Sequence, residues 1–284
     1  STTETPEVQR EALQQAAALY EKSGDEARTV AMLEQYVKRF PQPFDQSIEA
    51  RQKLADIAGR QGDGRRRAAL LEDVIRADRA AGAARTDRSR FLAAKAQLEL
   101  AQPARDAFVA IELTAPLKKS LAAKRAAMEQ ALKAYGAADE YAIAEVSTAA
   151  TFEMAELYRR LSADLLKSER PKNLGAEELE QYDLLLEEQA FPFEEKAIEI
   201  HLVNTARSAQ GVYDASVRAS FGALAKLKPA RFAKAEQGED LATDPAAAGA
   251  PLAVPAAVAG VPAPGAPPPS GASTAAPAAA SAPA

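Results

Sequence analysis

A Gly-Asp pair occurs twice in the first quarter of the chain, each time between two stretches of helical apolar spacing. Gly24-Asp25 lies at the middle of residues 10–41, and Gly62-Asp63 lies at the middle of residues 51–74. Glycine can adopt the left-handed conformation that ends a helix, and aspartate can accept hydrogen bonds from the free N–H groups of the next helix. Each segment is therefore predicted to form two antiparallel helices, which need a neighbour to cover their remaining apolar face.

Helical periodicity continues through the following residues. One apolar stripe runs for about seven turns from near Asp139, and its members are Ile143, Val146, Ala150, Met154, Leu157, Leu161 and Leu165. A similar stripe occupies residues 117–135, and a third helical hairpin is expected over residues 91–114. Because no run alternates apolar and polar residues as a half-buried strand does, the fold is predicted to be all-α.

The first segment resembles the tetratricopeptide repeat. The resemblance lies in the spacing from Tyr20 through Gly24-Asp25 to Pro41, although Thr29 and Tyr36 replace the small residues usual in that family. It implies an α-solenoid of antiparallel hairpins. We expect such hairpins in residues 1–115 and a bundle of longer helices, packed on the solenoid, in residues 116–235.

A second resemblance covers the C-terminal helical region. It rests on residues 182–197, on Gly211-Val-Tyr-Asp214 and on residues 227–232. These are similar to the C-terminal region of large bacterial tetratricopeptide-repeat proteins of the cell envelope, of the gliding-motility or TonB/TolA-associated type. The resemblance implies a periplasmic or outer-membrane-associated scaffold with a signal or lipid anchor upstream of Ser1. A cytoplasmic location is the alternative.

Composition excludes several classes of site and partner. The chain has no cysteine and one histidine, so disulfides and cysteine-ligated metals are excluded. Residues 1–235 are nearly neutral, because four of the acids but none of the bases follow Ala235, and this argues against nucleic acid. No stretch of about 18 apolar residues predicts a membrane span. Residues 236–284, rich in proline and alanine, are expected to be disordered, with a role as a ligand for a proline-binding module as the alternative.

The acidic residues before His201 are the strongest candidate for chemistry. They are Glu187, Glu188, Glu194 and Glu195. Glu199 and His201 are two residues apart and so point in different directions on a helix, unlike the Glu-x-x-His pairs of di-iron bundles. We expect Pro192 to open a helix whose dipole explains the acids Glu194 and Glu195 in its first turn. Phe191 and Phe193 are expected to form a core corner between two helices or, alternatively, an exposed aromatic anchor. His201 is expected to lie at the surface. No catalytic, cofactor-binding or metal residue is predicted, and the chain is not expected to be an enzyme.

The leading hypothesis is therefore a protein-interaction module that binds a peptide or partner helix through the solenoid surface. By register, four polar residues would face its groove: Gln14, Glu21, Gln52 and Asp56. The alternative is a structural helical spacer that oligomerises. Less favoured is a metal or acid/base enzyme that depends on His201 and Glu195. The partner is expected to belong to a cell-envelope complex, and the sequence does not fix the oligomeric state.

Overall fold

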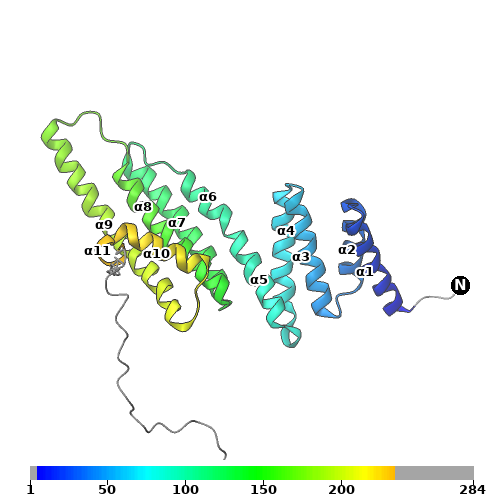
Figure 1. The fold of residues 1–284 in the computed structure, drawn as a ribbon. Coiled ribbons are helices and arrows are strands. Elements are labelled where there is room, and N and C mark those ends of the chain that lie inside the picture. Colours follow the sequence, from blue (N-terminus) through cyan, green and yellow to red (C-terminus); the bar gives the residue numbers. More distant parts are fainter. Residues whose placement is uncertain (1–4, 234–284) are drawn as a thin grey trace, which may run out of the picture. The chain divides into compact units, whose positions relative to one another are not determined.

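The computed structural model describes residues 5–233, and all regular structure in that range is helical (Figure 1). This confirms the all-α prediction. The helices are α1 (Pro6–Lys22), α2 (Glu26–Arg39), α3 (Phe44–Arg60), α4 (Gly64–Ala80), α5 (Asp87–Leu100), α6 (Gln102–Ala110), α7 (Leu117–Asp139), α8 (Ala144–Leu166), α9 (Ala176–Ala206), α10 (Ala215–Leu227) and α11 (Pro229–Phe232), with short 3₁₀ turns at Gly82–Ala84 and Arg207–Gln210. The tail predicted to be disordered, residues 236–284, lies outside the described residues.

Both Gly-Asp turns have the predicted conformation. Gly24 and Gly62 have φ values of 77° and 74°, in the left-handed region. The Asp25 side chain accepts from the Arg28 N–H at 3.0 Å, and the Asp63 side chain caps α4 in the same way. As a result α1–α2 and α3–α4 are antiparallel pairs (Figure 1).

The predicted third hairpin is wrong. A single residue, Ala101, joins α5 to α6, and its φ and ψ of −77° and −22° are those of a right-handed helix. One such residue cannot reverse the chain, so α6 continues in the general direction of α5 (Figure 1). Pro103 interrupts the hydrogen bonding without turning the chain, because proline is tolerated in the first turn of a helix.

Residues 5–233 belong to one compact unit, and the core is continuous across the predicted boundary at residue 115. One buried cluster combines Leu71 and Val74 of α4 and Leu92 of α5 with Ala138 and Val146 from beyond that boundary. A second cluster joins residues of α5–α6 to the stripe of α8. No helix within residues 5–233 is both long and apolar enough to cross a membrane.

The prediction that Pro192 opens a helix is wrong: this proline lies inside α9. An internal proline removes one hydrogen bond and costs about 3 kcal/mol. Packing offsets this cost, since Ala190 and Phe193 join the core cluster of α7 and α8 on either side of the proline. The predicted core corner is therefore wrong, because α9 continues through this segment: Phe193 packs against the core from within the helix, whereas Phe191 is 62% exposed.

Candidate functional site

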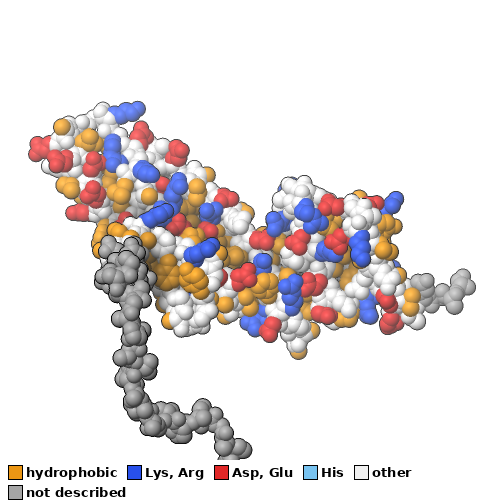
Figure 2. Space-filling model, in the orientation of Figure 1, with side chains coloured by type: hydrophobic (Ala, Val, Ile, Leu, Met, Phe, Trp, Pro, Cys, Tyr) orange, Lys and Arg blue, Asp and Glu red, His pale blue; other side chains and the backbone are white. Residues whose placement is uncertain are grey.

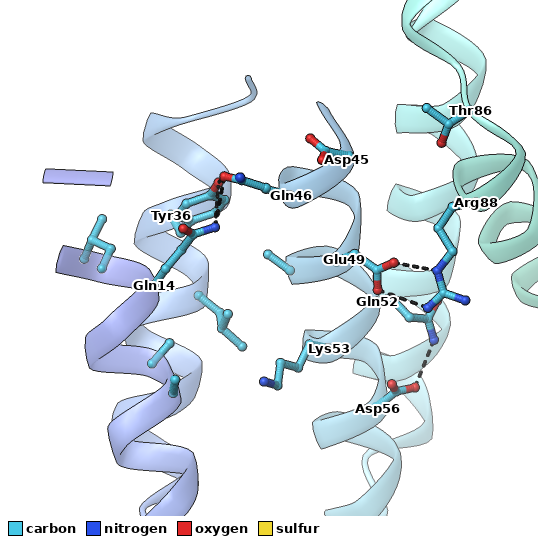
Figure 3. Close-up of a pocket in the computed structure, with 15 residues that line it drawn as sticks. Gln14, Tyr36, Asp45, Gln46, Glu49, Gln52, Lys53, Asp56, Thr86 and Arg88 are labelled. Atoms are coloured by element: carbon cyan, nitrogen blue, oxygen red, sulfur yellow. Dashed lines mark hydrogen bonds and ion pairs between the residues drawn. The ribbon is translucent and has the colours of Figure 1, made fainter. Parts of the chain in front are cut away.

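A hollow of about 840 Å³ lies between the first helices of the two antiparallel pairs, and we call it the N-terminal hollow (Figure 3). It is lined by Leu13, Gln14, Ala17, Ala18, Leu33, Tyr36, Asp45, Gln46, Glu49, Ala50, Gln52, Lys53, Asp56, Thr86 and Arg88. These residues come from α1, α2 and α3 and from the start of α5. The volume is within the range of small-molecule and peptide sites.

The floor of the N-terminal hollow is apolar and made largely of small side chains. Ala17 and Ala50 are buried on α1 and α3, and Leu33 is buried on α2 between them. Alanines on the facing sides of α1 and α3 leave space that larger side chains would fill. The hollow is thus a consequence of the small residues that also allow each helix pair to pack closely.

One end of the N-terminal hollow is closed by a hydrogen-bonded group of three side chains from three helices. The Gln14 amide donates to the Tyr36 hydroxyl at 3.2 Å and to Gln46 Oε1 at 3.1 Å, and the Tyr36 hydroxyl also donates to Gln46 Oε1. Tyr36 is almost fully buried, and this burial raises the pKa of its hydroxyl. The group fixes α1, α2 and α3 relative to one another at this end (Figure 3).

The rim carries charged side chains, several of them paired. Arg88 donates to both carboxylate oxygens of Glu49, at 2.5 and 3.2 Å, and this interaction raises the pKa of Arg88. Lys53 extends from α3 toward α1, where it pairs with Glu21. Asp45 and Asp56 have no ion-pair partner among residues 5–233, so the rim presents two unneutralised carboxylates.

The structure brings three of the four predicted partner-binding residues to this hollow. Gln14, Gln52 and Asp56 line it, and the Gln52 amide donates to Asp56 at 2.9 Å. Glu21 does not line it but reaches Lys53, which does. The binding role of all four stays a prediction.

Other lining residues were missed from the sequence. Glu49 and Lys53 share a helix face with Gln52 and Asp56, so helical spacing could have identified them. Arg88 belongs to α5 and is about 40 residues from its partner Glu49 in sequence, so no local pattern links it to α3.

A second polar group lies in the core between α8, α9 and α10, and it corrects the prediction that His201 is a surface residue. His201 is fully buried, with Nδ1 3.2 Å from Ser220 Oγ and Nε2 3.4 Å from Glu156 Oε1. The Asn204 amide donates to Ser220 Oγ at 2.9 Å and to the Thr148 carbonyl at 3.1 Å. The sequence around His201 could not predict these contacts, because Glu156 lies on α8 and Ser220 on α10, whereas His201 lies on α9.

Glu156 connects this buried group to the surface. Burial raises the pKa of its carboxyl, but the contacts with His201 and with Arg159 lower it more, and the resulting pKa is about 2. Arg159 donates to both carboxylate oxygens of Glu156 at 2.6–2.9 Å. The contact between Glu156 and His201 is longer, and His201 Nε2 forms no aligned hydrogen bond with any residue of 5–233. Glu156 is therefore ionised over the ordinary range of pH.

Ser220, His201 and Glu156 have the residue types of a hydrolase triad, but their surroundings do not suit catalysis. Ser220 is fully buried and already accepts a hydrogen bond from Asn204, so its hydroxyl has no access to a substrate carbonyl. Within residues 5–233, no three or more His, Asp or Glu side chains are grouped closely enough to hold a metal ion. We interpret the group as a polar network that joins α8, α9 and α10.

In comparison with known proteins, no protein-family model matches the chain, and no curated protein sequence is significantly similar to it.

Proposed function

We propose that this chain is a non-enzymatic interaction module whose N-terminal hollow binds an extended peptide or a helix of a partner protein. The observation that carries the proposal is the hollow itself, with an apolar floor, a polar rim and walls from two successive helix pairs. Sites that accept peptides and helices commonly combine apolar pockets with a few polar groups that fix orientation.

The contacts between the two pairs support a repeating arrangement. Gln14 contacts Gln46, and Glu21 contacts Lys53, so α1 and α3 meet at an offset of 32 residues. Glu34 and Arg66 join α2 to α4 at the same offset. Equal offsets support the proposed stacking of the two pairs as successive units of an α-solenoid.

Gln52 indicates which part of a peptide the hollow would recognise. Its Oε1 is shielded from solvent and has no hydrogen-bond partner among the described residues, although its amide nitrogen is bonded to Asp56. A buried acceptor without a partner costs about 1–3 kcal/mol. Rotation of the Gln52 amide into the hollow would let its oxygen accept from a backbone N–H of the bound segment, while apolar side chains of the segment occupy the alanine-lined floor.

Binding of selected peptides tests the proposal. Peptides are selected from a random display library on the full chain, and the tightest one is titrated calorimetrically against the double variant Gln14→Arg, Gln52→Arg. We expect roughly tenfold or greater loss of affinity, because two long cations then enter the hollow.

The matched control is Gln15→Arg, Gln130→Arg, which places the same charges on exposed helix positions outside the hollow. Equal affinities of the two double variants would remove the hollow as the binding site.

The cell-envelope location and a partner from a cell-envelope complex are part of the proposal on the strength of the C-terminal resemblance alone. Fractionation of the source cells with an antibody against the chain tests both. Recovery in the periplasmic or outer-membrane fraction is expected, and recovery with cytoplasmic markers would contradict this part of the proposal.

A further inference from the structure

The N-terminal half of α9 has two different faces. One face, which includes Leu186, Ala190 and Phe193, packs on the rest of the unit. The opposite face is exposed, and we call it the α9 outer face. It consists of Glu177, Glu180, Gln181, Leu184, Glu187, Glu188, Phe191 and Glu195.

Two large apolar side chains lie at the centre of the α9 outer face. Leu184 and Phe191 are 56% and 62% exposed, and Leu185, at its edge, is 55% exposed. Leu184 and Phe191 are seven residues apart, which is about two turns, so they lie one above the other. Single exposed apolar residues are common, but such a row on one helix face is typical of a docking surface.

Acidic residues surround this apolar row. Ala176–Ala206 contains nine acids and one lysine, and that lysine, Lys196, is paired with Glu199. Figure 2 shows acidic and apolar side chains together at the end of the unit formed by this part of α9. Five carboxylates have no ion pair with any residue of 5–233: those of Glu177, Glu180, Glu187, Glu188 and Glu195.

The charge of the α9 outer face limits what can cover it. The chain's own residues 236–284 contain no basic residue, so they offer no complementary charge. The same face of a second copy would bring glutamates against glutamates, and an anionic lipid surface would also be repelled. A segment with lysines or arginines around an apolar stripe would neutralise the glutamates and cover the exposed apolar side chains.

We propose that the α9 outer face binds a basic amphipathic helix of a partner protein, with Leu184 and Phe191 in its apolar stripe and the flanking glutamates against its cations. Aromatic side chains surrounded by complementary charge are frequent centres of binding energy. This surface is independent of the N-terminal hollow and uses different helices.

The test uses a synthetic helical peptide of leucine and lysine, with leucines on one face and lysines on the other, and a shuffled peptide of the same composition. Fluorescence anisotropy of the labelled peptide is measured with the full chain at physiological salt. The amphipathic peptide should bind, the shuffled one should bind at least roughly tenfold more weakly, and Leu184→Ser, Phe191→Ser should lose at least roughly tenfold in affinity.

Two control variants separate docking from general attraction. Leu19→Ser removes a 66% exposed leucine from α1 and should leave binding unchanged. Glu180→Gln, Glu187→Gln, Glu188→Gln should weaken binding severalfold. Glu7→Gln, Glu72→Gln, Glu129→Gln removes the same charge elsewhere and should have little effect.

Two results would overturn the proposal. The first is equal binding of the parent and Leu184→Ser, Phe191→Ser. The second is sedimentation showing that the parent forms a dimer that this variant abolishes, since the face would then be a contact between copies of the chain. Neither result changes the expectation for peptides bound in the N-terminal hollow, so failures of the two proposals are distinguishable.

Discussion

The ion pairs that join α1–α2 to α3–α4 lie at the surface, whereas the charged and polar side chains Lys124 and His201, which join α6–α10, are buried. Glu34–Arg66 and Glu21–Lys53 are solvent-exposed ion pairs between successive helix pairs. By contrast, Lys124 and His201 are fully enclosed by α6–α8 and by α8–α10. Exposed pairs contribute little to stability, while breaking a buried one is strongly destabilising. The N-terminal pairs thus keep charge available at a rim, and the C-terminal helices use polar groups to fix their packing.

The largest effect is expected at Lys124. Its Nζ lies 2.8 Å from Asp164 and donates to the carbonyls of Phe108 and Ile111 at 3.1 and 2.6 Å. Lys124→Met removes all three contacts and leaves Asp164 with Arg160 as its remaining ion-pair partner, and we expect the free energy of unfolding to fall by about 3 kcal/mol. Urea denaturation measures this, with Lys119→Met on the exposed side of α7 as the control. Similar losses in the two variants would remove the contrast between buried and exposed charge.

Asn204 should have the next largest effect. Asn204→Ala removes the donor to Ser220 and to the Thr148 carbonyl and leaves both acceptors buried. We expect a loss of about 2 kcal/mol in urea denaturation. If Asn204→Ala were as stable as the parent, the polar network would have no part in joining α8, α9 and α10.

Glu156 should make the stability of the C-terminal helices depend on pH. Its folded-state pKa of about 2 lies below the ordinary value of 4.5, so its contribution is complete above pH 4.5 and is lost as the pH falls toward 2. Between pH 5 and pH 3, the free energy of unfolding of Glu156→Gln should therefore fall by about 2 kcal/mol less than that of the parent. Thermal melts across this interval measure the difference, with the exposed Glu129→Gln as control. Parallel pH profiles of parent and Glu156→Gln would contradict the assignment.

The smallest effect is expected for the surface ion pairs of the N-terminal region. A double-mutant cycle on Glu34 and Arg66 should give a coupling of about 0.5 kcal/mol or less, which high salt should reduce further. A coupling above about 2 kcal/mol would show that these pairs determine how the helix pairs stack.

Local signals were sufficient to predict the elements whose ends depend on local chemistry. The left-handed glycines at 24 and 62 and the aspartate caps that follow them need only a few neighbouring residues, and the stripe of α8 needs only its own spacing. The direction of α6 and the course of α9 through Pro192 were not predictable in this way. In both cases long-range packing outweighs a proline that locally favours an interruption.

The candidate site was partly predictable for the same reason. Gln52 and Asp56 follow from the face of one helix, and Gln14 follows from the equivalent position in the preceding pair. The contacts of Arg88 with Glu49 and of His201 with Ser220 and Glu156 join helices distant in sequence, so only the three-dimensional arrangement identifies them.

The central claim is that the N-terminal hollow is a binding site, and a substitution that fills it tests this most directly. Ala18 lines the hollow but is exposed, so Ala18→Trp should block it without disturbing the core, while Leu19→Trp places the same side chain at the next position, outside the hollow. Calorimetric titration with the library-selected peptide should show binding lost in Ala18→Trp and retained in Leu19→Trp. Full affinity in Ala18→Trp would contradict the account.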